Sequence, residues 1–155
     1  MNQMLTIPAY AKLNLALDIT GKREDGYHLM HMVMQTVDLC DTLELKKIES
    51  GISFYCDDAS IPCDEGNIAW RAADAFFAAS GISGGVAVAL HKAIPHEAGL
   101  AGGSADAAAV LKGLNQMHGE PFSISELCRL GETLGADVPY CIVGGTAGGE
   151  GIGEK

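Results

Sequence analysis

The chain has 155 residues, of which 48% are apolar and 19% charged, and its formal net charge at pH 7 is −10. This composition predicts one globular domain with its own core and excludes a disordered chain. The negative charge argues against a nucleic-acid partner, whose phosphates require a basic surface. No apolar run approaches the ~20 residues that span a bilayer, so we expect no membrane segment.

The amino terminus and the cysteines indicate a cytoplasmic protein. The first residues, MNQMLTIPAYAK, lack the basic segment and apolar stretch that are typical of a secretory signal. Five scattered cysteines argue against a disulfide framework and favour reduced, mostly buried thiols. Their spacing does not fit a zinc site, and a metal site built on His28 and His31 lacks a third ligand.

Apolar and polar residues alternate in the first third of the chain, which predicts strands. These strands cover residues 4–20, 29–37, 42–48 and 52–56. The polar segment GKREDGYH, residues 21–28, is expected to be a loop. A tight turn is expected near residues 38–41, between two of the strands.

Helix formers with an apolar stripe predict three helices, over residues 68–80, 104–117 and 123–134. We expect Asn67 to cap the first helix and Gly81 to end it. Residues 85–93 alternate and predict a strand, residues 138–145 a strand or a turn with a strand, and the glycine-rich end a flexible turn. The order of elements predicts an α+β fold with a mostly antiparallel sheet.

A glycine-rich segment lies before the second predicted helix. It consists of Pro95, His96, Glu97, Ala98, Gly99, Leu100, Ala101, Gly102, Gly103, Ser104 and Ala105. Glycines let backbone N–H groups approach phosphate oxygens, and a helix start adds unpaired N–H groups and a positive dipole end. Lys92 could supply a cation, Ser104 could cap the helix or contact a phosphate, and Asp106 suits the helix dipole. The alternative is a tight turn whose glycines only permit close packing.

Three segments together resemble the galactokinase–homoserine kinase–mevalonate kinase–phosphomevalonate kinase (GHMP) superfamily. They are AYAKLNL (residues 9–15), the glycine-rich segment, and GADVP (residues 135–139). Within the superfamily, residues 21–45, with REDGYH and MQTVD, resemble the 4-diphosphocytidyl-2-C-methyl-D-erythritol kinases of non-mevalonate isoprenoid biosynthesis. The resemblance implies a GHMP kinase N-terminal domain of the ribosomal protein S5 domain 2-like fold, with helices on one face of the sheet.

The resemblance also implies a reaction, the transfer of the ATP γ-phosphoryl group to the 2-hydroxyl of 4-diphosphocytidyl-2-C-methyl-D-erythritol. Asp137 would accept the hydroxyl proton, and Lys12 would keep Asp137 ionised and stabilise the transferring group. The glycine-rich segment would hold the ATP phosphates, with Lys92 beside it and Asn67 near the adenine. Mg²⁺ should accompany ATP without a dedicated carboxylate site.

For the small-molecule substrate, the resemblance implies that Tyr27 stacks on the cytosine, His28 binds the edge of the base, and Asn14 contacts the methylerythritol. Taken without the resemblance, the residues leave plainer interpretations open. Asp137 is then a turn aspartate, Lys12 an edge-strand lysine, and Tyr27 with His28 an exposed hairpin loop.

Kinases of this family are about twice as long as this chain, so residues 1–155 are expected to form the N-terminal ATP-binding domain without the C-terminal domain. Two alternatives to the kinase assignment follow. The chain is either another GHMP small-molecule kinase or a non-catalytic nucleotide-binding fragment with little activity. A face left by the missing domain could support self-association.

Overall fold

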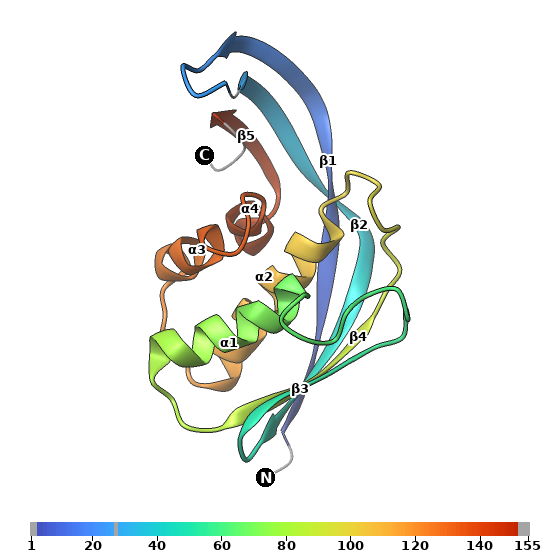
Figure 1. Cartoon of the computed structure of the whole chain (residues 1–155), viewed down its shortest axis with the longest axis vertical. Helices are drawn as coiled ribbons and strands as arrows, with labels where there is room; N and C mark the ends of the chain where they lie inside the picture. Colours follow the sequence, from blue (N-terminus) through green and yellow to red (C-terminus); the bar gives the residue numbers. More distant parts are fainter. Residues whose placement is uncertain (1–2, 27, 152–155) are drawn as a thin grey trace.

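The computed structural model describes residues 3–26 and 28–151. Within these residues, five strands form one sheet: β1 (Met4–Lys22), β2 (His28–Ile48), β3 (Gly51–Cys56), β4 (Gly85–His91) and β5 (Thr146–Gly151). The same residues include four helices: α1 (Ile68–Ser80), α2 (Gly102–Met117), α3 (Ile124–Glu132) and α4 (Val138–Val143). The helices pack on one face of the sheet (Figure 1), which confirms the expected α+β fold.

The sheet is mostly antiparallel, as expected. Its order is β1-β2-β4-β3, and β5 pairs with the other part of β2. Only the β3–β4 pair is parallel among the described pairs. The long strands β1 and β2 extend beyond the helical layer as a ribbon (Figure 1).

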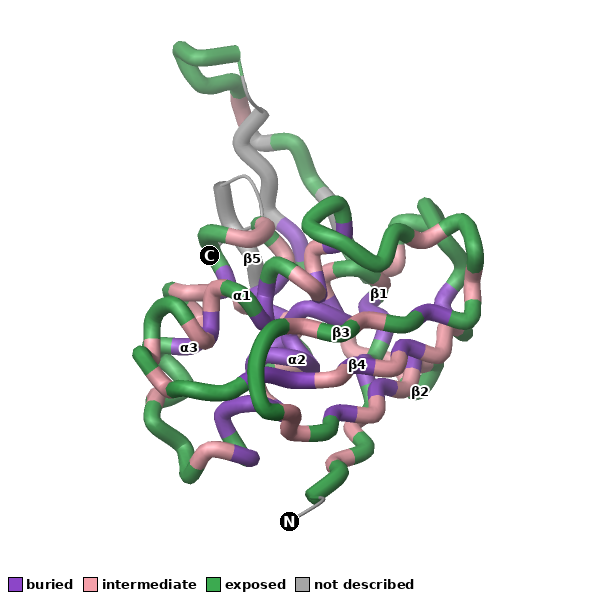
Figure 2. Tube along the Cα trace, turned by 60° about the horizontal axis from the view of Figure 1, so that its bottom comes forward, coloured by how far each residue is buried: buried purple, intermediate pink, exposed green. Residues whose placement is uncertain are grey.

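Helix α2 lies at the centre of the core, between the sheet and the other helices. Buried residues gather along it and along the strands that it covers (Figure 2). Its alanines and Gly113 let it approach β2 closely, because a Cβ atom on Gly113 would stand 2.3 Å from Leu45 Cδ1. Phe76 of α1 is fully buried and meets Phe122 edge to face at 5.5 Å between ring centroids.

Strand β2 is continuous, so the turn predicted near residues 38–41 is wrong. Between the pairs Tyr10–Cys40 and Lys12–Thr36, three residues of β2 oppose the single residue Ala11 of β1. The ladder is therefore irregular where a turn was expected. The polar residues that suggested this turn include Asp41. In the fold Asp41 is fully buried rather than exposed in a turn.

The carboxyl-terminal predictions are also wrong in two places. Residues 138–143 form a helix, because Pro139 suits its first turn and Gly144, at φ 70°, ends it. The glycine-rich residues 146–151 form a strand, because β2 offers unpaired backbone groups to which they bond in an antiparallel ladder. No helix in the described residues has the length and apolar character needed to cross a membrane.

Candidate active site

The structure brings Lys12 and Asp137 together from opposite ends of the sequence. The Lys12 Nζ atom lies 3.9 Å from Oδ2 of Asp137, and it donates a hydrogen bond to Asn14 Oδ1 at 3.2 Å. The Lys12 side chain is 7% exposed and that of Asp137 is 34% exposed. A buried cation thus faces a carboxylate that solvent and ligands can reach.

Local structure explains both positions. Lys12 follows the irregular step of the β1–β2 ladder, which alters the alternation of β1 and buries the lysine. Asp137 is the N-cap residue of α4, but its carboxylate does not bond to the N–H groups of that helix. The carboxylate therefore keeps its hydrogen-bonding capacity for another partner.

The glycine-rich segment encloses a cavity of about 200 Å³, lined by Lys92 and residues 95–103. We call residues 95–103 the phosphate loop. Its backbone is left-handed at Glu97, Gly99 and Ala101, with φ of 57°, 74° and 56°. Left-handed steps between other conformations turn successive N–H groups toward one concavity, which suits an anion.

Helix α2 begins at Gly102, two residues before the predicted start at Ser104. Its N-cap is Ala101, which provides no side-chain hydrogen bond, so the N–H groups of the first turn lack a side-chain cap. Ser104 therefore does not cap the helix. Neither Ser104 nor the buried Ala105 lines the cavity of the loop.

The phosphate loop is joined to the strand that carries Lys12. The backbone N–H of Lys12 donates to the carbonyl oxygen of Leu100 at 3.1 Å. This single bond sets the loop beside the Lys12–Asp137 pair. Lys12 and Asp137 do not themselves line the cavity of the loop, so the bond places only the Leu100 end of the loop beside the backbone of Lys12.

Lys92 lines the cavity, and two aspartates bind its ammonium. Nζ lies 2.6 Å from Asp41 Oδ2 and 3.0 Å from Asp106 Oδ2. Burial works to lower the pKa of Lys92, but the charges and hydrogen bonds of the two aspartates raise it. Asp106, for which the sequence suggested a role in complementing the helix dipole, is thus a buried partner of Lys92.

Asn67 caps α1, as predicted. Its Oδ1 accepts from the N–H of Ala69 and its Nδ2 donates to the carbonyl of Pro62, both at 2.9 Å. Both polar groups of the side chain are therefore engaged within the protein. Asn67 does not line the cavity of the loop, and a contact with adenine stays a prediction.

The predicted cytidine pocket falls largely where the structure gives no description. Tyr27 lies outside the described residues, and of His28 only the backbone is described, as the start of β2. Within the described ranges, no group of three His, Cys, Asp or Glu side chains could hold a metal ion. The five cysteines are free, but the expectation that they are mostly buried is wrong: Cys56 is buried, Cys40, Cys128 and Cys141 are partly exposed, and Cys63 is exposed.

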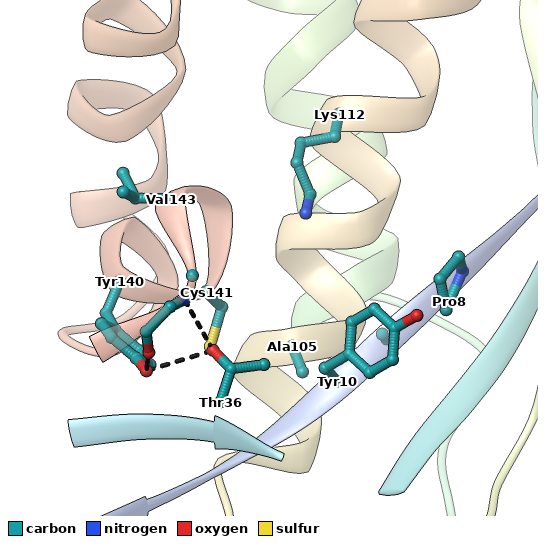
Figure 3. Close-up of a pocket in the computed structure, with 11 residues that line it drawn as sticks. Pro8, Tyr10, Thr36, Ala105, Lys112, Tyr140, Cys141 and Val143 are labelled. Carbon is teal, nitrogen blue, oxygen red and sulfur yellow. Dashed lines mark hydrogen bonds between the residues drawn. The ribbon is translucent and has the colours of Figure 1, made fainter. Parts of the chain in front are cut away.

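A second cavity, of about 220 Å³, opens between β1, α2 and α4 (Figure 3). Lys112 projects into it, and burial lowers the pKa of this lysine. On the opposite wall, Thr36, Tyr140 and Gly145 form a hydrogen-bond network. Because Tyr140 is on α4, this network ties the helix that begins at Asp137 to β2. Sequence patterns did not reveal it, since its members are far apart in the chain.

Comparison with known proteins identifies the family. The family model of the GHMP kinases N terminal domain matches residues 67–145, just over half of the chain. The chain therefore belongs to the GHMP kinase family, as the motifs predicted.

Among its relatives are enzymes named 4-diphosphocytidyl-2-C-methyl-D-erythritol kinase. The one from Clostridium beijerinckii is 56% identical over 151 residues, which are 97% of this chain and 54% of the relative. The one from Clostridium kluyveri is 52% identical over the same coverage. The chain thus spans about half the length of these relatives.

Solved structures of kinases also resemble this chain. A crystal structure of 4-(cytidine 5'-diphospho)-2C-methyl-D-erythritol kinase has a TM-score of 0.86 at 39% identity, covering 97% of this chain and 53% of that one. A homoserine kinase from Cytophaga hutchinsonii has a TM-score of 0.72 at 23% identity, covering 92% and 47%. The second similarity shows the fold alone.

Proposed function

We propose that this chain is the ATP-binding, catalytic half of a kinase that phosphorylates the 2-hydroxyl of 4-diphosphocytidyl-2-C-methyl-D-erythritol. The observation that carries the proposal is the 3.9 Å approach of Lys12 and Asp137 beside the phosphate loop. The relatives, which match over 97% of this chain, and the 39% identical structure support the choice of substrate. On this proposal, residues 1–155 are the N-terminal domain of a cytoplasmic enzyme with no nucleic-acid partner.

The residues divide the work of phosphoryl transfer. Asp137 accepts the proton of the attacking hydroxyl, and Lys12 favours the ionised form of Asp137 and stabilises charge on the transferring group. The phosphate loop holds the nucleotide so that its γ-phosphoryl group faces Asp137. Asn14 receives a hydrogen bond from Lys12 and so lies where it can contact the acceptor.

Magnesium is expected to arrive with ATP and to neutralise charge on its phosphates. The described residues form no side-chain cluster that could hold a metal by itself. We therefore assign no residue of this chain as a magnesium ligand. Tyr27 and His28 remain our candidates for the cytidine pocket on the strength of the REDGYH motif.

The test compares the chain with two variants, Lys12→Met and Asp137→Asn. ATP binding is measured by calorimetry, and ADP release is measured with the diphosphocytidyl substrate, mevalonate, homoserine and a sugar as acceptors. Loss of a general base lowers turnover by about 10²- to 10⁴-fold, and Asp137→Asn should do so without abolishing ATP binding. Turnover with a different acceptor alone would replace the proposed substrate, and absence of ATP binding would overturn the proposal.

A second candidate is a nucleotide-binding fragment without catalytic activity. It is favoured by one observation, that the chain covers 54% of its relative from Clostridium beijerinckii. ATP binding without turnover of any acceptor would support it. Turnover of about 1–100 per second by the chain alone would exclude it.

A further inference from the structure

Three buried ionisable side chains meet below the phosphate loop, and their charges do not balance. The Lys92 ammonium touches both Asp41 and Asp106, at 2.6 Å and 3.0 Å. The side chains of Lys92, Asp41 and Asp106 are 9%, 0% and 4% exposed, so water screens them little. Two carboxylates and one ammonium leave one buried negative charge, which proteins commonly remove by binding a proton.

The hydrogen bonds show which aspartate holds that proton. Asp41 Oδ1 accepts from the N–H groups of Ala93 and Ile94 at 2.6 and 2.8 Å, and its Oδ2 accepts from Lys92. These bonds favour ionised Asp41. Asp106 Oδ2 accepts from Lys92, and the Asp106 carboxyl group also bonds to that of Asp41, but its buried Oδ1 has no hydrogen-bond partner among the described residues. An unpaired oxygen costs far less in a neutral carboxyl than in a carboxylate.

The pKa values of the two aspartates move in opposite directions. Burial and the hydrogen bond with Asp41 raise the pKa of Asp106 to about 8. Burial works to raise the pKa of Asp41 as well, but its hydrogen bonds, from Asp106 first, lower it overall. Near neutral pH the cluster therefore consists of one carboxylate, one ammonium and one carboxylic acid, with no net charge.

The cluster joins both ends of the phosphate loop to the sheet. Asp41 stands on β2 and binds the backbone of Ala93 and Ile94, directly before Pro95. Asp106 lies in the first turns of α2, three residues after the end of the loop at Gly103. Lys92 connects the two aspartates, and a Cβ atom on Gly102 would stand 3.3 Å from its Nζ. The separation of the two loop ends thus depends on this cluster.

We propose that Asp106 is a positioning residue whose protonated carboxyl completes a neutral cluster with Asp41 and Lys92, holds the ends of the phosphate loop, and so supports nucleotide binding. The proposal rests on the proposed ATP-binding function of the loop. When Asp106 loses its proton, the cluster gains a negative charge below the nucleotide phosphates and loses the bond between the two carboxyl groups. Both effects weaken the binding of an anion.

The sign of the pH dependence follows from the folded-state pKa, which lies above the ordinary value of 3.8. The stabilisation by the proton on Asp106 is fully present below the ordinary value of 3.8, and it is lost progressively as the pH rises from there to and through about 8. The groups that face Asp106 are Asp41 on β2 and Lys92 after β4. Cys141 on α4 is also close, and the charge of Asp106 contributes to the raised pKa of Cys141.

Calorimetric titration of the 155-residue chain with ATP, between pH 7 and pH 9, tests the proposal. Proton and ATP act as coupled ligands, so we expect the affinity to fall by about 5-fold or more over this range. Titrations near pH 8 in two buffers of different ionisation enthalpy should show protons taken up as ATP binds. Asp106→Asn keeps the shape, neutrality and donor of the protonated carboxyl, so its affinity should stay constant and the uptake should vanish.

Two further comparisons make the result decisive. Asp106→Ala, which lacks the donor, should bind ATP more weakly at every pH, while Asp106→Asn retains the affinity of the wild-type chain at pH 7. In urea unfolding without ligand, the wild-type chain should lose stability between pH 7 and pH 9 relative to Asp106→Asn. Equal pH profiles of affinity and stability in these two proteins would overturn the role of Asp106. Absence of ATP binding at every pH would instead remove the proposed function, and the unfolding comparison would still decide the protonation of Asp106.

Discussion

The network of Thr36, Tyr140 and Gly145 offers a quantitative test of how α4, and with it Asp137, is held in place. The Tyr140 hydroxyl donates to the Gly145 carbonyl at 2.5 Å, so the Thr36 hydroxyl, 3.1 Å away, donates to Tyr140. The N–H of Gly145 donates to Thr36 Oγ1 at 3.0 Å. Tyr140→Phe and Thr36→Val each remove two of these three bonds while keeping the shape of the side chain.

Each net hydrogen bond contributes about 0.5–1.5 kcal/mol, so each variant should lose ~1–3 kcal/mol of unfolding free energy. For Tyr140→Phe the low end is expected, because the Gly145 carbonyl also accepts from the backbone N–H of Thr36. For a chain of this size, 1 kcal/mol corresponds to a change in Tm of ~2–4 °C. The double variant removes three bonds rather than four, so it should lose ~1 kcal/mol less than the sum of the single variants.

Urea unfolding, followed by circular dichroism, measures the free energy of unfolding of the wild-type chain, the two single variants and the double variant. Tyr55→Phe is the matched control, because Tyr55 is 57% exposed and the change should stay within ~0.5 kcal/mol. Single-variant effects that add within ~0.3 kcal/mol would show that the hydroxyl groups of Thr36 and Tyr140 do not act together. The network would then not hold α4.

Two further predictions concern the thiols and the core. Burial, followed by the charge of Asp137, raises the pKa of Cys141 to about 12. Iodoacetamide at pH 8 should therefore alkylate the exposed Cys63 before Cys141. Comparable labelling rates of these two thiols in mass spectrometry would contradict this. Asn115→Ala leaves the N–H and C=O of Phe122 without their hydrogen bonds of 3.0 and 2.9 Å. We expect urea unfolding to show a loss of ~2–4 kcal/mol in the free energy of unfolding. The control Gln116→Ala, at an exposed neighbouring position, should lose ~0.5 kcal/mol or less.

The sequence predicted well those elements whose signals are local. Helix α1 has the bounds expected for residues 68–80, because an apolar stripe, a capping Asn67 and a left-handed Gly81 all agree within one segment. The phosphate loop was also recognisable, since glycines before an alanine-rich helix mark a backbone that can approach a ligand. Lys12 and Asp137 were identified by motif, and the structure then placed them 3.9 Å apart.

Other elements could not be predicted, because their signals depend on partners elsewhere in the chain. Residues 146–151 have too many glycines to predict a strand, yet β2 supplies the hydrogen bonds that make them one. Asp41 resembles a turn residue in the sequence, but in the fold it binds the backbone of Ala93 and Ile94. Asp106 resembles an ordinary helical aspartate until Lys92 and Asp41 surround it.

The sequence by itself therefore determined the family, the order of most elements and the segments to which we assign the chemistry. Only the tertiary structure decided which charges are paired, which are buried and which face a cavity. The physical reason is that periodicity and caps act over a few neighbouring residues. Burial and ion pairing instead depend on the packing of elements that are distant in the chain, and this packing sets the pKa values and contacts on which the site depends.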